Sequence, residues 1–259
     1  MKSEEEGPLL RVEELTKVFG GVLALNRVSF ELRKGEILGV MGPNGSGKTT
    51  LINCITGFLK PNSGKIFFKG KDITGMPPHR IADMGIGRTF QIMRPYYSLP
   101  AYKNLIVPLF SPRARKFAGG GKLGDRDTVA IDILEDVGFE RDANVPYKPA
   151  GALPLGYLKR LELGRCIALR AEVMLCDEVF SGLSATEIAS LVPLVERLNM
   201  QEGATLLMIE HRLRELFRVA HRIVVMNFGE KIFEGNPEEA LQNHGVKEAY
   251  FGKGKEALL

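Results

Sequence analysis

The apolar residues of the chain fall into short runs whose spacing suits strands near both ends and helices in the middle. Residues 9–38 alternate such runs with turns at Gly20-Gly21 and Lys34-Gly35, a pattern typical of a β-meander. A turn over residues 61–64 leads into a further apolar run at residues 65–68. We therefore expect an antiparallel β part, contributed mainly by the N-terminal third of the chain.

From about residue 95 to residue 163 the sequence pattern is typical of helices joined by loops. Five apolar residues in this part fall at helical spacing and give one apolar face: Val129, Ala130, Ile133, Leu134 and Val137. An earlier helix is predicted over residues 48–58, between a glycine-rich segment and the turn at residues 61–64.

Within the helical part, residues 111–127 carry four basic side chains around three consecutive glycines. The basic residues are Arg113, Arg115, Lys116 and Lys122. This composition indicates a mobile basic surface loop. We favour a solvated loop over a specific contact with phospholipid or nucleic acid, which the same charges would also suit.

After residue 163, predicted strands and helices alternate. Continuous apolar runs at residues 173–176, 205–209 and 223–226 are typical of parallel strands covered on both faces. The helix between the first two runs begins with a capping box, from Ser184 to Glu187. This alternation predicts an α/β fold.

Composition and charge narrow the classes of function. The chain has 259 residues, of which 44% are hydrophobic and 25% charged, as in an ordinary globular protein with a substantial core. The formal net charge of +4 is too small to indicate nucleic acid as a partner. Cys54, Cys166 and Cys176 lack CxxC spacing, so we expect buried thiols in a reducing compartment.

The sequence does not suggest a membrane segment. No apolar stretch approaches the roughly 20 residues that span a bilayer. Residues 1–6 are acidic where a signal peptide would be basic and then apolar. We expect a cytoplasmic protein whose membrane role comes through a partner.

Residues 42–50 read GPNGSGKTT and directly follow the apolar run of residues 37–41. The string matches the phosphate-binding loop G-x-x-x-x-G-K-[ST] in its expected place, between a buried strand and a helix. Lys48 supplies a positive charge for the β- and γ-phosphates, and the Thr49 hydroxyl can ligate Mg²⁺. A glycine-rich turn without a ligand is the alternative, which the preceding strand disfavours. The predicted phosphate-binding residues are Gly42, Pro43, Asn44, Gly45, Ser46, Gly47, Lys48, Thr49 and Thr50.

Asp177 and Glu178 follow the apolar run of residues 173–176. Two acids at a buried strand end are costly unless a positive group meets them. In phosphate-loop proteins that group is Mg²⁺, which the strand-end Asp holds through water. A Glu directly after it suits a general base for water that attacks the γ-phosphate. A solvated strand end is the alternative.

The order of these motifs resembles the nucleotide-binding subunit of an ATP-binding cassette (ABC) transporter over almost the full chain. The resemblance implies an α/β P-loop NTPase (RecA-like) core with an antiparallel β subdomain and a helical subdomain. It implies one domain over residues 1–259, with residues 1–94 and 164–259 as core and antiparallel part and about 95–163 as the helical subdomain.

The resemblance also implies roles for three residues that are unremarkable singly. Gln91 would touch Mg²⁺ and the attacking water and would sense the membrane partner. His211 would contact the γ-phosphate, and Phe19 would stack on adenine. Residues 181–184 resemble the loop that crosses the interface between two cassettes.

The family signature, LSGGQ or LSYGQ, is replaced here by residues 153–160, LPLGYLKR. In the family this segment closes over the γ-phosphate held by the other subunit, so Gly156 would bind nucleotide in trans. Pro154 stands in place of the serine and offers neither a hydroxyl nor an N–H. Losing one hydrogen bond to a charged group would weaken closure or slow hydrolysis roughly ten- to hundred-fold. We expect a weakened but working signature, because the helix that follows still directs its positive end and the Gly156 N–H toward the phosphate.

Three shorter segments indicate a subfamily. Residues 87–91, 209–212 and 232–237 resemble the corresponding segments of branched-chain amino-acid importer ATPases, and lipopolysaccharide-export ATPases have similar sequences there. The importer is favoured. The resemblance implies ATP and Mg²⁺ as ligands and a place at the cytoplasmic face of the inner membrane, through permease subunits. It also implies a second ATP-binding subunit, alike or different, and a periplasmic-type substrate-binding protein in the complex.

Other phosphate-loop proteins fit less well. A guanine-specific GTPase would carry an N-K-x-D string, which the chain lacks. Small-molecule kinases lack the set of Gln91, signature and His211, and chromosome-organising ATPases need a long coiled coil. Translation-associated relatives usually carry two cassettes. The strongest rival is a regulatory module that closes on ATP and hydrolyses it poorly, which Pro154 and Tyr157 suggest.

Overall fold

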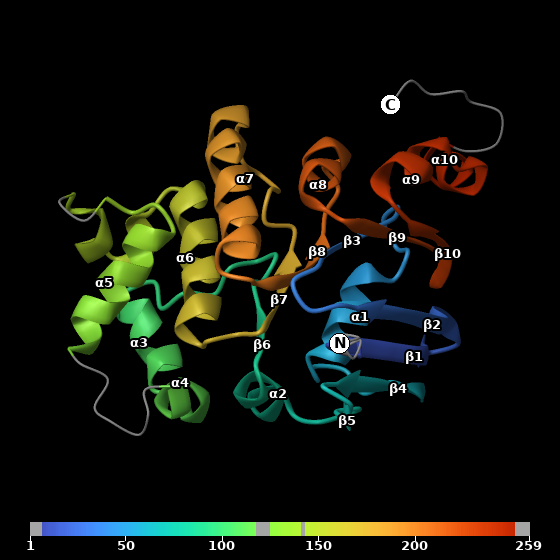
Figure 1. The fold of residues 1–259 in the computed structure, drawn as a ribbon, viewed down its shortest axis with the longest axis horizontal. Helices are drawn as coiled ribbons and strands as arrows, with labels where there is room; N and C mark the ends of the chain where they lie inside the picture. Colours follow the sequence, from blue (N-terminus) through green and yellow to red (C-terminus); the bar gives the residue numbers. More distant parts are fainter. Residues whose placement is uncertain (1–6, 118–124, 141–142, 252–259) are drawn as a thin grey trace, which may run out of the picture. The chain divides into compact units, whose positions relative to one another are not determined.

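Figure 1 shows the chain in a computed structural model, which describes residues 7–117, 125–140 and 143–251. The chain divides into two compact units, one of residues 1–81 and 199–259 and the other of residues 82–198. No helix among the described residues is long and apolar enough to cross a membrane.

The first unit contains two sheets. One is antiparallel, in the order β2-β1-β4-β5, and in the other the strands of this unit follow the order β10-β9-β3-β8. The strands are β1 (Leu10–Phe19), β2 (Val22–Leu32), β3 (Ile37–Met41), β4 (Ser63–Phe68), β5 (Lys71–Asp72), β8 (Thr205–Ile209), β9 (Arg222–Asn227) and β10 (Glu230–Gly235). Strand β3 pairs in parallel with β8 and with β9, and the buried side chains of the three strands are mostly apolar.

Helices cover both sides of the parallel strands in this unit. Figure 1 shows α8, α9 and α10 on one side of β3, β9 and β10, with α1 and the antiparallel sheet on the other. The helices are α1 (Lys48–Ile55), α8 (Leu213–Val219), α9 (Pro237–Gln242) and α10 (His244–Phe251). Coverage on both faces explains why these strands are continuous apolar runs.

The second unit is mainly helical and holds the parallel pair β6 (Ile86–Arg88) and β7 (Val173–Asp177). Its helices are α3 (Lys103–Leu109), α4 (Pro112–Phe117), α5 (Arg126–Asp136), α6 (Leu155–Ala168) and α7 (Ala185–Met200), with short 3-10 turns at Val145–Tyr147 and Ala150–Ala152. Helix α2 (Pro78–Met84) carries the chain into this unit. Helices α3, α5 and α6 pack on one another around buried Leu105, Leu134 and Leu161.

Several predicted elements are confirmed. The apolar runs after residue 163 are strands β7, β8 and β9, the capping box at Ser184 forms, and all three cysteines are buried thiols. The apolar face at residues 129–137 packs inward from α5 and its C-cap, with Leu134 fully buried.

The β-meander prediction holds across Gly20-Gly21, where β1 and β2 pair antiparallel, and fails in strand order, because β1 lies between β2 and β4. The apolar runs at residues 22–25 and 28–32 form one strand, β2, with a register irregularity around Arg27, whose φ is +50°. An extra residue at such a bulge interrupts the alternation of buried side chains, so one strand reads as two.

The helix predicted for residues 48–58 ends at Ile55. Gly57 follows with φ +76°, and a Cβ there would lie 2.1 Å from the Met76 oxygen. This backbone conformation requires glycine and terminates the helix.

The basic loop prediction is wrong for Pro112–Phe117, which form helix α4, and Arg113 of this helix is buried. Its guanidinium binds Glu172 at 2.6 Å and the main-chain oxygens of Met84 and Arg170. The guanidinium fastens α4 to the turns beside β6 and β7. Lys122 and the three glycines lie outside the described residues.

Candidate active site

The phosphate-loop residues follow β3 and lead into α1 in the first unit. Gly42 has φ +155°, and a Cβ on it would lie 2.2 Å from the Met226 oxygen. Gly47 has φ +102°, and its Cβ would lie 2.5 Å from the Ala24 oxygen. Both glycines are therefore required where the loop passes the backbone of β9 and β2.

Lys48 is buried and its ammonium lies inside the loop. Its Nζ donates to the Gly42 oxygen at 2.7 Å, to the Pro43 oxygen at 3.0 Å and to Ser46 Oγ at 3.4 Å. These three partners are neutral, so a phosphate oxygen would be a stronger one. Helix α1 starts at Lys48 without a side-chain cap, which leaves its first N–H groups directed at the loop.

Register places His211 at the same sheet edge as the phosphate loop. Val40 of β3 pairs in parallel with Ile209 of β8. Gly42 is two residues beyond Val40, and His211 is two residues beyond Ile209. Both therefore leave the sheet at the carboxyl ends of adjacent strands, where ligands of α/β proteins bind.

Phe19 ends β1 with 43% of its surface exposed, and the Lys17 ammonium lies 5.0 Å from the centre of its ring. The ring is thus accessible for stacking and does not belong to the core. Whether adenine stacks on it stays a prediction.

In the second unit, Gln91 and Glu178 are brought together by β6 and β7. Arg88 pairs in parallel with Leu175, and the two functional residues each lie three positions further along. Gln91 Nε2 donates to Glu178 Oε2 at 2.9 Å. Glu178 has φ +54°, an unusual conformation for a residue with a side chain, and its main-chain oxygen accepts from the buried Lys159 ammonium at 2.7 Å.

Asp177 is buried and ion-paired. Its Oδ2 lies 2.8 Å from Arg88 Nη2, and its N–H donates to Thr89 Oγ1. Its Oδ1 is buried and has no hydrogen-bond partner among the residues that the structure describes. A buried carboxylate oxygen of this kind fits a hydrated Mg²⁺, because a hard cation or its water satisfies it.

The replaced signature segment leads into α6. Pro154 is the N-cap of that helix and makes no side-chain cap hydrogen bond. Gly156 is buried, and the Tyr157 ring packs edge-on against Phe139 with centroids 4.9 Å apart. Tyr157 is thus engaged within its own unit, where the family has a glutamine.

Three residues that contact the candidate site residues were not predicted as part of the site. Arg88 and Lys159 hold the two acids, and Tyr250 of α10 lies beside the backbone of Gly42. Burial raises the pKa of Tyr250 to about 12, and the Gly42 N–H acts against this rise. Arg88 could have been found from its place two residues before Phe90-Gln91; Tyr250 has no sequence signal, because its contact depends on how the C-terminal helices fold back.

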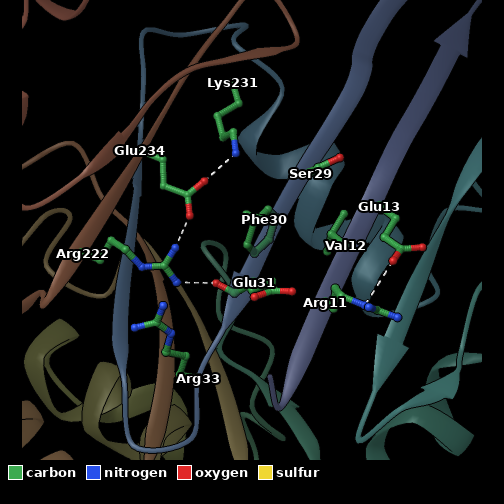
Figure 2. Close-up of a pocket in the computed structure, with 10 residues that line it drawn as sticks. All are labelled: Arg11, Val12, Glu13, Ser29, Phe30, Glu31, Arg33, Arg222, Lys231 and Glu234. Atoms are coloured by element: carbon green, nitrogen blue, oxygen red, sulfur yellow. Dashed lines mark hydrogen bonds and ion pairs between the residues drawn. The ribbon is translucent and has the colours of Figure 1, made fainter. Parts of the chain in front are cut away.

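A cavity of about 400 Å³ in the first unit lies apart from these residues (Figure 2). Charged side chains line it, and most of them pair with one another: Arg11 with Glu13, and both Arg222 and Lys231 with Glu234. No residue of the phosphate loop or of the acidic pair lines it. We interpret it as a structural ion-pair network.

Comparison with known proteins agrees with this geometry. Residues 25–181 match the family model described as ABC transporter. The chain belongs to the ABC transporter family. It is 35% identical to the high-affinity branched-chain amino acid transport ATP-binding protein BraF of Pseudomonas aeruginosa, over 95% of this chain and 98% of that protein. It is 36% identical to LivG of Escherichia coli, of the same description, over the same shares.

A solved structure extends the likeness to the fold. The ADP conformation of an ATP-binding cassette of an ABC transporter is similar with a TM-score of 0.81 and 34% identity, over 95% of this chain and 99% of that one. The ABC ATPase fold predicted from the sequence is therefore confirmed. The chain is an ATPase, as members of this family are.

Proposed function

We propose that this chain is the ATP-binding and ATP-hydrolysing subunit that powers an importer of branched-chain amino acids. The hydrogen bond between Gln91 and Glu178 carries the hydrolytic part of the proposal, because it holds a carboxylate at the end of β7 beside the amide that would orient the attacking water. The likeness to BraF and LivG supports the substrate class.

The residues divide the work as follows. Lys48 and the loop N–H groups bind the β- and γ-phosphates, Phe19 stacks on adenine and His211 contacts the γ-phosphate. Glu178 accepts a proton from the attacking water, and Gln91 orients that water. Mg²⁺, when bound, would neutralise phosphate charge; Thr49, Gln91 and, through water, Asp177 would hold it.

A second cassette, alike or different, completes each site. Gly156 of one cassette binds the γ-phosphate held by the other, so an isolated cassette has little ATPase activity. Two closed cassettes would move the permeases between inward- and outward-facing states, and hydrolysis would reset them.

An exposed apolar surface next to Gln91 supports a permease partner. Ile92 and Tyr97 are 76% and 53% exposed, and Tyr147 is 51% exposed. The main chain joins their segments, since Ala150 donates to the Leu99 oxygen and Gly151 to the Tyr97 oxygen. Clustered exposed aromatic residues mark protein interfaces. Through permeases, the chain would lie at the cytoplasmic face of the inner membrane, with a periplasmic-type binding protein in the complex.

Two alternative functions differ from this proposal, one in the partner proteins and the other in the rate of ATP hydrolysis. A lipopolysaccharide exporter would use the same cassette chemistry, but the relatives described above are named for amino-acid transport. A regulatory module with weak hydrolysis is favoured by Pro154, which leaves α6 without a side-chain cap.

The test isolates the tagged chain with its neighbours from its own cells. We expect two permease proteins and an amino-acid-binding protein, and leucine-stimulated ATPase once the complex is in proteoliposomes. Ile92→Asp should abolish co-purification, because a charge is costly in an apolar interface. Met200→Asp is the matched control at an equally exposed apolar residue. Recovery of lipopolysaccharide-export proteins would overturn the substrate class.

A further inference from the structure

Glu187, outside the predicted set of site residues, reaches the signature segment within the second unit. Its carboxylate lies beside the Gly156 N–H, which helps to lower the pKa of that carboxyl. A Cβ placed on Gly156 would lie 2.8 Å from Glu187 Oε1, which shows how closely the carboxylate approaches. The Pro154 N-cap supplies no side-chain acceptor to this turn, so an acid from α7 supplies one instead.

Ser184 holds the other oxygen of the same carboxylate. Glu187 Oε2 accepts from the Ser184 N–H at 2.9 Å and from its hydroxyl at 2.8 Å. Hydrogen bonds from the Ser184 N–H and hydroxyl, and then from Gly156, lower the pKa of Glu187. The side chain therefore carries a negative charge at neutral pH, and this charge lies at the positive end of α6.

This arrangement conflicts with the proposed role of Gly156. One N–H group cannot bind both its own chain's carboxylate and a phosphate from a second cassette, and the two anions would repel each other at contact distance. We propose that Glu187 makes an autoinhibitory contact: it occupies the Gly156 N–H in the separate cassette and must move away before the signature segment accepts ATP in trans. The inference rests on the proposed function of Gly156.

Glu187→Gln separates this role from a structural one. Glutamine can keep the capping box with Ser184, so α7 retains its start. It removes the charge that competes with phosphate. Glu196→Gln is the matched control, because Glu196 is the other acid of α7.

The experiment measures the ATP concentration that gives half-maximal dimerisation, with Mg²⁺, in the full chain carrying Glu178→Gln. Adding Glu187→Gln should lower that concentration at least about 5-fold, since a hydrogen bond to a charged acceptor is stronger than one to a neutral acceptor. Adding Glu196→Gln should leave it unchanged, and melting temperatures with ADP should agree among the three.

The outcomes separate the two proposals. If Glu178→Gln dimerises and the added Glu187→Gln leaves the half-maximal concentration unchanged or raises it, Glu187 is a fixed cap and the inference fails alone. If no variant dimerises with ATP, the role of Gly156 in trans fails, and the inference fails with it.

Discussion

Two adjacent acids in this chain have different partners, and the difference suits two different tasks. Asp177 faces a guanidinium and keeps one oxygen without a partner, whereas Glu178 faces the Gln91 amide. The amide can hold the Glu178 carboxylate in place for a proton-accepting role. The geometry thus supports the two proposed roles, metal-facing for Asp177 and proton-accepting for Glu178.

Glu178→Gln should reduce the ATPase activity of the transporter complex by at least ~10², because glutamine cannot take the proton. ATP binding should persist, since Lys48 and its loop are untouched. Steady-state phosphate release and ATP binding by titration calorimetry check both parts. An unchanged rate would remove Glu178 as the base.

The buried thiols predict how fast the chain reacts with a thiol reagent at neutral to mildly basic pH. Burial raises the pKa of Cys54 to about 11 and that of Cys166 to about 12. The thiolate is the nucleophile, and below these pKa values the thiol form dominates. The native chain should therefore react slowly with a thiol reagent at pH 8 and rapidly after denaturation, as absorbance of the released thiol product would show. Rapid labelling of either residue in the native chain would contradict this burial.

The sequence indicates candidate site residues more readily than their contacts. The glycines of the phosphate loop meet a local backbone requirement and the two acids directly follow a buried strand, so each set is visible in one short stretch of sequence. The partners Arg88, Lys159 and Glu187 depend on side chains that meet across strands and helices. Only the register of β6 on β7 and the packing of α6 bring them together, and strand β6, three residues long, is too short to show a pattern.

Helix α6 begins at an unusual N-cap, Pro154, and this residue determines the rate of ATP hydrolysis that we expect. Serine is a preferred N-cap residue, and its hydroxyl can bond a phosphate, whereas proline does neither. Pro154→Ser should raise the ATPase activity of the complex about 10-fold, the value of one hydrogen bond to a charged group.

Pro154→Ala is the control for that substitution, because it removes the ring without adding a hydroxyl. It should not raise the rate. If Pro154→Ser and the unchanged chain hydrolyse ATP at equal rates, the missing serine hydroxyl does not limit turnover.

Elements with both faces covered were the easiest to predict. Continuous apolar runs identify β7, β8 and β9, because no polar side chain interrupts a strand buried on both sides. Local exceptions depart from these patterns: a bulge at Arg27 interrupts the alternation of side chains in β2, Gly57 ends α1 early, and Arg113 is buried with an ion pair to Glu172. None of these is visible in an apolar pattern alone.

At the scale of the whole molecule, the proposed function requires a second cassette, alike or different. The phosphate loop and His211 belong to the first unit, and Gln91, Asp177, Glu178 and the signature segment belong to the second. Because Gly156 is proposed to act on ATP held by another cassette, ATP is what joins the two. Blocking hydrolysis should therefore preserve the joined state.

The most direct test measures the mass of the Glu178→Gln chain by light scattering, with saturating ATP and Mg²⁺ and with its natural partner cassette present. The account predicts two cassettes held together with ATP and separate cassettes with ADP, and Lys48→Ala in the same background should abolish the association. Separate cassettes under every nucleotide condition would contradict it.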